Sequence, residues 1–163
     1  MQGTRAPGGG CLASVSALFS HSRLAYGARV RCFMIAVAQS STLDRYSNNF
    51  SLFLLLEQFR PSAYPARLSV FSHAFFEIDA DENGVEHQVR LLVVQGSRTA
   101  FESEAVSFKP AGERHRVRIS GLAFPEPGLY RVMVEWRERT GDADGAWTRE
   151  PVAWPIRADV PLQ

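Results

Sequence analysis

The sequence predicts an all-β protein, built as a single antiparallel β-sandwich of about eight strands. Two observations support this prediction. From Met34 onward, β-branched and aromatic residues gather in short runs with two-residue alternation, and clusters of Gly, Pro, Asn and Asp separate the runs. In addition, no stretch repeats its apolar residues with the 3.6-residue period of an amphipathic helix. Short strands at such close spacing are typical of a sandwich or a barrel.

Residues 1–33 are expected to form an N-terminal extension outside the fold. This segment holds both cysteines and four arginines but no acidic residue. It matches a targeting segment poorly, because no small-residue cleavage site follows its apolar run at residues 11–19. We expect residues 1–33 to be disordered or loosely ordered and residues 34–160 to form the β-sandwich domain. The choice between a targeting segment and an upstream extension stays open.

The first four strands are expected at residues 35–41, 50–58, 67–78 and 85–95. Their β-branched and aromatic content favours an extended backbone. The acidic, glycine-ended stretch DADENG separates the third strand from the fourth. Such a connection is typical of a hairpin turn, so these two strands are expected to be neighbours.

The fifth and sixth strands, 101–108 and 114–120, are expected to pair as a hairpin across the turn KPAGE. Alternation directs one set of side chains toward the core: His115, Val117 and Ile119. It directs the other set toward solvent: Arg114, Arg116 and Arg118. In this register Glu104 lies opposite Arg116 and Glu102 opposite Arg118, so ion pairs account for the arginines without a ligand. A ligand site on this arginine face is the alternative.

The seventh strand, at residues 129–138, has the clearest pattern. Its inward set is expected to be Tyr130, Val132, Val134 and Trp136. Before it, Pro125 and Pro127 fix φ, and Gly128 supplies freedom where the chain turns. This layout is like the tyrosine corner of immunoglobulin-type sandwiches, in which the tyrosine hydroxyl bonds a nearby backbone group. The expected sandwich is therefore immunoglobulin-like.

The eighth strand, at residues 147–157, follows TGDADG, a further acidic, glycine-ended connection of hairpin type, and it carries two prolines. Pro151 and Pro155 remove backbone donors from one side of the strand. The strand is therefore expected at the edge of its sheet, where missing donors protect it against pairing with another chain.

Composition and charge argue against a membrane or nucleic-acid partner. The longest apolar run, FSLFLLLEQF, is broken by Glu57 and Gln58, far short of the roughly 18 residues that a membrane helix needs. Without residues 1–33, 14 basic residues (18 − 4) stand against 17 acidic ones, so phosphate neutralisation is not expected to drive binding. The chain after residue 33 lacks cysteine, which favours a cytoplasmic location over secretion.

No sequence motif assigns an enzymatic activity. The chain contains no G-x-S-x-G elbow, P-loop or dinucleotide fingerprint, so no cofactor and no catalytic residue are expected. The candidates for a hydrolytic or metal-dependent site, assembled from distant strands, are His73, His87 and His115. The alternative is that these histidines are core or boundary residues without a catalytic role.

An apolar outward face favours an interaction function. Phe71 and Phe75 point outward from the third strand, and Leu92 and Val94 do so from the fourth. If these strands pair, the four side chains form a hydrophobic patch for a protein partner or for self-association. The alternative is that a loop, the proline-rich stretch RPSAYPARL or the N-terminal segment covers the patch.

The overall layout resembles a known family. The stretch MIAVAQSSTLDRYSNNFSLFLLLEQFRPSAYPARLSV, the later motif GLAFPEPGLYRVMVEW and a closing short strand are similar to a family of small uncharacterised bacterial β-sandwich domains. The resemblance covers most of residues 34–156, and its motifs are structural. It implies the fold but no activity, cofactor or catalytic residue. Taken together, the sequence favours a non-enzymatic binding or scaffolding domain, with the histidine-based enzyme as the alternative.

Overall fold

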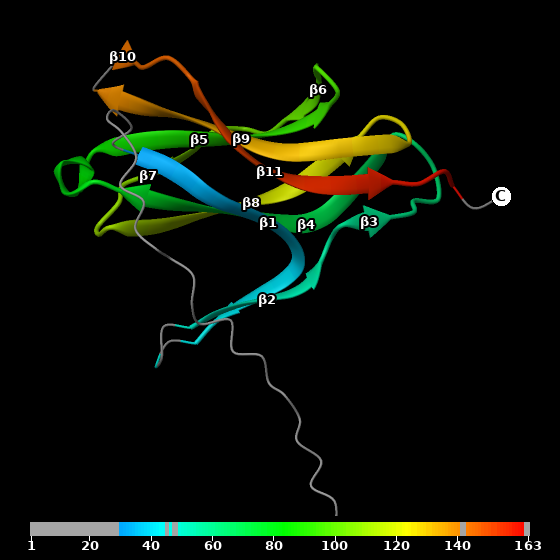
Figure 1. The fold of residues 1–163 in the computed structure, drawn as a ribbon, viewed down its shortest axis with the longest axis horizontal. Helices are drawn as coiled ribbons and strands as arrows, with labels where there is room; N and C mark the ends of the chain where they lie inside the picture. Colours follow the sequence, from blue (N-terminus) through cyan, green and yellow to red (C-terminus); the bar gives the residue numbers. More distant parts are fainter. Residues whose placement is uncertain (1–29, 45, 47–48, 141–142, 162–163) are drawn as a thin grey trace, which may run out of the picture.

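The computed structural model describes residues 30–44, 46, 49–140 and 143–161 (Figure 1). Within these residues the chain is almost entirely β-strand, apart from one short 3-10 turn, η1 (Ala80–Glu82). The strands are β1 (Val30–Leu43), β2 (Phe50–Leu55), β3 (Gln58–Phe59), β4 (Ala66–Ile78), β5 (Glu86–Gln95), β6 (Arg98–Glu102), β7 (Val106–Phe108), β8 (Arg114–Phe124), β9 (Gly128–Thr140), β10 (Ala143–Asp144) and β11 (Thr148–Ala158). The all-β prediction is confirmed.

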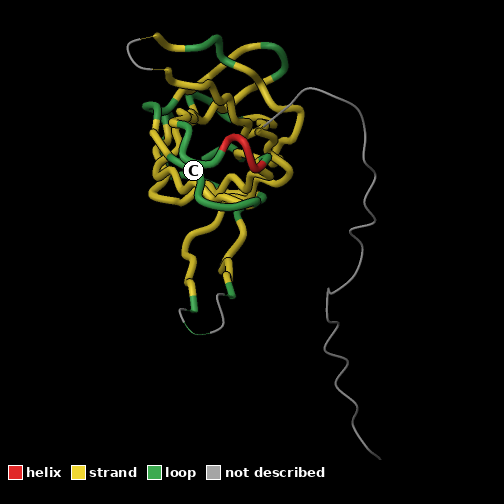
Figure 2. Tube along the Cα trace, turned by 90° about the vertical axis from the view of Figure 1, so that its left-hand side faces the viewer, coloured by secondary structure: helices red, strands yellow, loops and turns green. Residues whose placement is uncertain are grey.

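The strands form two sheets. The smaller sheet has the order β2-β1-β4-β8, and the larger has the order β3-β11-β9-β5-β6, with β10 pairing with β9 and β7 with β5. Every described pairing is antiparallel except that between β11 and β3. The far ends of β1 and β2 leave the two layers as a projecting hairpin, which both views show plainly (Figures 1 and 2).

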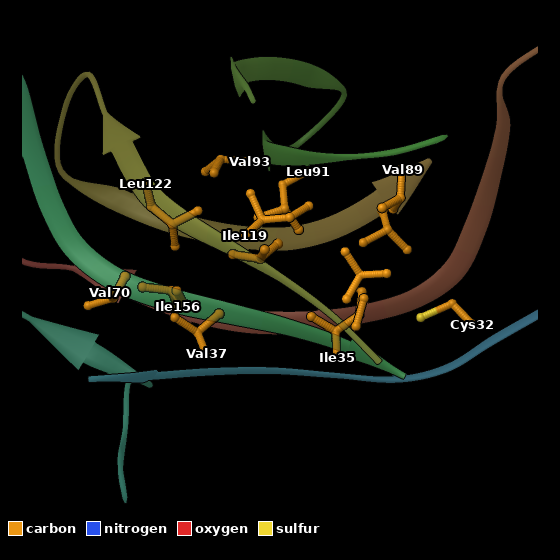
Figure 3. Packing of buried hydrophobic residues seen from close by; sticks show 14 of the residues in the cluster. Cys32, Ile35, Val37, Val70, Val89, Leu91, Val93, Ile119, Leu122 and Ile156 are labelled. Atoms are coloured by element: carbon orange, nitrogen blue, oxygen red, sulfur yellow. The ribbon is translucent and has the colours of Figure 1, made fainter. Parts of the chain in front are cut away.

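The core lies between the two sheets, as two-residue periodicity predicts. In β9, Tyr130, Val132 and Val134 are buried, and Trp136 packs against the same cluster. Val89, Leu91 and Val93 of β5 extend this layer toward Ile35 and Val37 of β1. Figure 3 shows these aliphatic side chains meeting between the strands. The predicted inward face of the seventh strand is confirmed.

The corner before β9 also forms as expected. The Tyr130 hydroxyl donates a hydrogen bond to the carbonyl oxygen of Glu126 at 2.8 Å. Gly128 has a φ of 157°, and a Cβ at this position would lie 2.3 Å from the Gln95 side-chain nitrogen. A larger residue at this position would therefore displace the end of the Gln95 side chain and would adopt a φ that glycine tolerates best.

The first strand begins earlier than the sequence suggests. β1 starts at Val30, where the side chains of Val30 and Cys32 enter the core and pair with Ile78 and Phe76 of β4. Four residues of the expected extension thus belong to the strand. The expectation for residues 1–29 lies outside the described residues.

Two of the three connections predicted as hairpins, DADENG and KPAGE, are wrong, whereas TGDADG joins β9 to β11, which pair antiparallel. β4 and β5 lie in different sheets, and so do β7 and β8. Both connections lie at one end of the molecule, where the Gly84 amide donates to the Pro110 carbonyl and the Ile78 amide, at the end of β4, donates to the carbonyl of Glu113. Turn chemistry identified where the chain reverses but not which sheet it enters next.

The last strand is only partly an edge. β11 pairs with β9 along its length and with β3 only at Arg157 and Ala158. Its predicted edge position therefore holds from Thr148 to Ile156 among the described residues. The short β3 closes the end of the strand.

Candidate interaction surface

The outer face of the four-stranded sheet carries a layer of arginine and phenylalanine side chains. We call it the aromatic–arginine face, and its members are Phe33, Phe50, Phe71, Phe75, Arg114, Arg116 and Arg118. Since residues two apart in a strand point to the same side, the three arginines of β8 all reach this face. The rings come from β1, β2 and β4, so all four strands of the sheet contribute.

Each arginine lies over one ring. The guanidinium carbon of Arg116 is 3.8 Å from the Phe50 ring centre and that of Arg118 is 4.8 Å from the Phe71 ring centre. Arg114 is more distant, at 5.9 Å from Phe33. Such cation–π contacts contribute about 0.5–1 kcal/mol at exposed sites. The arginines are therefore held by aromatic rings.

The ion pairs predicted for these arginines are wrong. β8 pairs with β4, which places Arg116 opposite Phe75 and Arg118 opposite His73. Glu102 instead binds Arg90 of the neighbouring strand β5. The prediction failed because it assumed that the fifth and sixth expected strands share a sheet.

His73 is buried beneath this face. Its side chain is fully inaccessible, and the ring of Phe50 covers it at a centroid distance of 5.1 Å. Neither ring nitrogen has a hydrogen-bond partner among the described residues. Burial, together with the nearby charges of Arg116 and Arg118, lowers the pKa of His73 to about 4. The imidazole is therefore neutral at pH 7.

The projecting hairpin exposes apolar side chains on β2. Phe53, Leu54 and Leu55 are 48%, 69% and 48% exposed, and Leu43 of β1 is 45% exposed. Leu54 has a φ of 55°, a left-handed conformation that is strained for a leucine. β2 ends its sheet, so the described strands pair with it on one side only. The hairpin is thus an apolar edge directed away from the core.

The predicted patch of Phe71, Phe75, Leu92 and Val94 is not brought together. Phe71 and Phe75 are half-buried on the aromatic–arginine face, whereas Leu92 and Val94 lie on the outer side of the other sheet. There Leu92 and Val94 are 1% and 3% exposed, because they pack with Met133 and Ala153. The condition for the patch, pairing between the third and fourth strands, is not met.

Sequence reasoning missed the role of β2. Phe50 covers His73, and Phe53 and Leu55 are exposed, whereas the sequence pattern predicts only an ordinary strand at residues 50–58. The available signal was the absence of any charged residue from Phe50 to Leu56. An uncharged strand is unusual at an exposed edge, because charges normally guard such edges.

The three candidate histidines do not converge. His73 lies on the outer face, whereas His87 and His115 contact the ring of Phe108, at centroid distances of 5.4 and 4.9 Å. The Nε2 atom of the fully buried His87 is 3.4 Å from Oε2 of the buried Glu82. Burial lowers the pKa values of His87 and His115. Among the described residues, no group of three or more His, Cys, Asp or Glu side chains could hold a metal ion.

The outer face of the larger sheet carries a separate charged network. The carboxylate of Glu135 is buried and accepts hydrogen bonds from Arg90 and Arg149. The ring of Trp147 lies against two guanidinium groups, 4.2 Å from that of Arg90 and 4.5 Å from that of Arg137. The network is internally satisfied, so it points to no ligand.

No protein-family model matches the chain, and no curated protein matches it. The part of the chain that the structure describes contains no helix with the length and apolar character that a bilayer crossing requires.

Proposed function

We propose that this chain is a non-enzymatic protein-binding domain, and that the β1–β2 hairpin is its main contact surface. One observation carries the proposal: Phe53, Leu54 and Leu55 are exposed on a terminal strand that projects from the two layers (Figure 2). Exposed apolar side chains on an unpaired strand edge favour pairing with another polypeptide.

A comparison of the strand edges supports this choice. The edges of the larger sheet are protected in other ways: β3 has only two residues and β7 only three, β11 carries two prolines, and β6 carries the charged residues Arg98 and Glu102. In the smaller sheet, β8 carries three arginines. Only β2, among the described terminal strands, combines several residues with no charge and no proline. It lacks the features with which proteins normally prevent edge pairing.

The alternative is a hydrolase or metal-dependent enzyme built around His73, His87 or His115. Its one supporting observation is the buried contact between His87 and Glu82. A buried histidine beside a carboxylate is also a common structural feature, and no third ligand accompanies this pair in the described residues. Elemental analysis of the purified protein tests the alternative, which stoichiometric zinc or iron would support.

The assignment of the two sheets as an immunoglobulin-like sandwich is part of the same proposal. The hydrogen bond from Tyr130 to Glu126 supports it, because such sandwiches share a tyrosine corner. We also propose a cytoplasmic location and kinship with the bacterial β-sandwich family. These two proposals rest on sequence features: the lack of cysteine after Cys32 and the motif around Tyr130.

The test of the binding function is a double substitution on the hairpin. Phe53→Ser with Leu55→Ser removes two side chains that are about half exposed, so thermal stability should change little. Association with a partner, or self-association in light scattering, should weaken by at least about tenfold, equivalent to about 1.4 kcal/mol.

The matched control is Leu129→Ser, which removes a 73% exposed leucine of β9, a strand of the other sheet. This variant should associate like the original protein. Equal binding by the hairpin variant and the original protein would contradict the proposal. So would a loss of binding in the control as large as that in the hairpin variant.

A further inference from the structure

The opposite edge of the same sheet offers a second docking position with different chemistry. β8 is the terminal strand on that side, and the described residues pair with it only through β4. Its outward side chains include Arg116 and Arg118, two residues apart, which in a strand corresponds to about 6.8 Å. The edge thus presents two regularly spaced cations beside an unpaired backbone.

The charge of these two arginines is not neutralised within the described chain. Neither Arg116 nor Arg118 forms an ion pair there, and both guanidinium groups lie over phenylalanine rings, which carry no net charge. Burial and the proximity of Arg118 lower the pKa of Arg116, which shows that the two cations oppose each other. A carboxylate placed between or beside them would relieve this repulsion.

A cavity of about 400 Å³ lies next to this edge. It is lined by Arg118, Ile119 and Ser120 of β8 and, from the other sheet, by residues that include Phe101 and Val106. Glu102 and Glu104 line the same cavity, so a carboxylate directed into it would meet like charges. A neutral side chain that contacts Phe101, Val106 and Ile119 therefore fits this space better than a carboxylate.

We propose that the free edge of β8 binds an extended acidic segment of a partner protein as an additional strand. Alternate side chains of this segment are carboxylates, which lie on the outer face beside Arg116 and Arg118. The intervening side chains are apolar and enter the cavity beside Ile119, Phe101 and Val106. The inference rests on the proposed function in one respect, namely that the ligand is a polypeptide.

Charge also selects against other occupants of this edge. A second copy of β8, paired antiparallel, would place arginines close to arginines, which is destabilising. A basic segment is rejected for the same reason. The arginines therefore act as a selective edge, which repels cationic strands and attracts anionic ones.

The experiment uses a synthetic peptide of about eight residues that alternates glutamate and valine, a length typical of one strand. Titration of the full chain with this peptide should show saturable binding that weakens as salt increases. Arg116→Glu with Arg118→Glu should reduce the affinity at least about tenfold. Arg98→Glu with Arg131→Glu, two exposed arginines of the other sheet, is the matched control and should bind normally.

Two further measurements keep the result interpretable. Because Arg116 stacks on Phe50, Arg118→Glu alone is tested in parallel, and the fold of each variant is checked by circular dichroism. Hydrogen exchange should show that the peptide protects amides of β8 and leaves those of β2 unchanged. Protection of β2 instead of β8 would overturn the inference.

Other outcomes would also overturn it. These are equal binding of a lysine–valine peptide, preference for a single-stranded oligonucleotide over the acidic peptide, or normal binding by a folded Arg118→Glu variant. Failure of the proposed function gives a different result. The hairpin substitutions at Phe53 and Leu55 would then leave association unchanged, while the acidic peptide still bound β8.

Discussion

The buried imidazole of His73 makes the stability of the protein depend on pH. The histidine is fully inaccessible and lies between its own sheet and the Phe50 ring of the hairpin. Its nitrogens have no partner in the described structure, and two arginines of β8 lie nearby. Among the described residues, the other elements packed against His73 contribute no charge to it: Ala36 of β1 lies opposite, and Phe75 is its ring neighbour on β4. Protonation of His73 is therefore disfavoured in the folded protein but not in the unfolded chain.

The size of the effect follows from the two pKa values. The pKa is 6.5 in the unfolded chain and about 4 in the folded protein. Below pH 6.5 the unfolded chain takes up a proton that the folded protein does not, so the free energy of unfolding falls as the pH decreases. Between pH 7.5 and pH 5 linkage gives a loss of about 2 kcal/mol from this residue. The loss levels off below the folded pKa, where both states are protonated.

His73→Leu should remove this dependence. The free energy of unfolding of the variant, measured by urea denaturation, should fall about 2 kcal/mol less than that of the original protein between pH 7.5 and pH 5. The variant should also be more stable at pH 7.5, by up to about 1–3 kcal/mol, because a buried polar group without partners is removed.

His115→Gln is the control for this experiment. It removes a partly exposed histidine but leaves His73 in place, so most of the pH dependence should remain. Parallel pH curves for His73→Leu and the original protein would refute the reasoning. A large loss of stability in His73→Leu at pH 7.5 would also refute it, since it would mean that the imidazole makes favourable hydrogen bonds.

Two other predictions concern the core. Tyr130→Phe removes the donor to the Glu126 carbonyl and should lower the free energy of unfolding by about 1 kcal/mol, whereas an unchanged urea midpoint would contradict the corner. Burial raises the pKa of Cys32 to about 12, so iodoacetamide at pH 8 should label this thiol only after unfolding. Peptide mapping by mass spectrometry identifies the labelled site, and rapid labelling of the native protein would show that the start of β1 opens.

Two-residue periodicity predicted the strands and the core well, because it depends only on local alternation. The side chains of Val132 and Val134 are buried as expected, and most strand positions agree within a few residues. Alternation predicts that the outward side chains of β9 are exposed, but two of them are buried. Met133 packs with Leu92 on the outside of the sheet, and Glu135 is covered by its ion pairs with Arg90 and Arg149. Burial of an outer face depends on side chains from other strands, which alternation within one strand does not reveal.

Strand neighbours were much harder to predict than strands. The turn KPAGE has the composition of a hairpin turn. However, β7, which ends at Phe108 before the turn, and β8, which begins at Arg114 after it, belong to different sheets. This error also produced the wrong partners for Arg116 and Arg118, because Glu102 lies in β6 of the other sheet and Glu104 lies in the connection from β6 to β7. A short separation along the sequence favours pairing of consecutive strands. The apolar side chains are buried equally well, however, when the chain crosses from one sheet to the other.

The two terminal strands of the smaller sheet, β2 and β8, differ in the charge that they present to an incoming strand. An edge strand with neither charge nor proline accepts any extended segment of suitable apolar character, and β2 has this composition. β8 instead carries arginines at alternate positions, so its pairing energy depends on the charge of the incoming strand. Under the two proposals, a neutral apolar segment gains more binding free energy at β2 than at β8, because no charge must be desolvated at β2. An acidic alternating segment gains more binding free energy at β8. If both proposals hold, the charge of the partner determines the edge at which it binds, and Phe53→Ser with Leu55→Ser should weaken binding of a different ligand from Arg118→Glu.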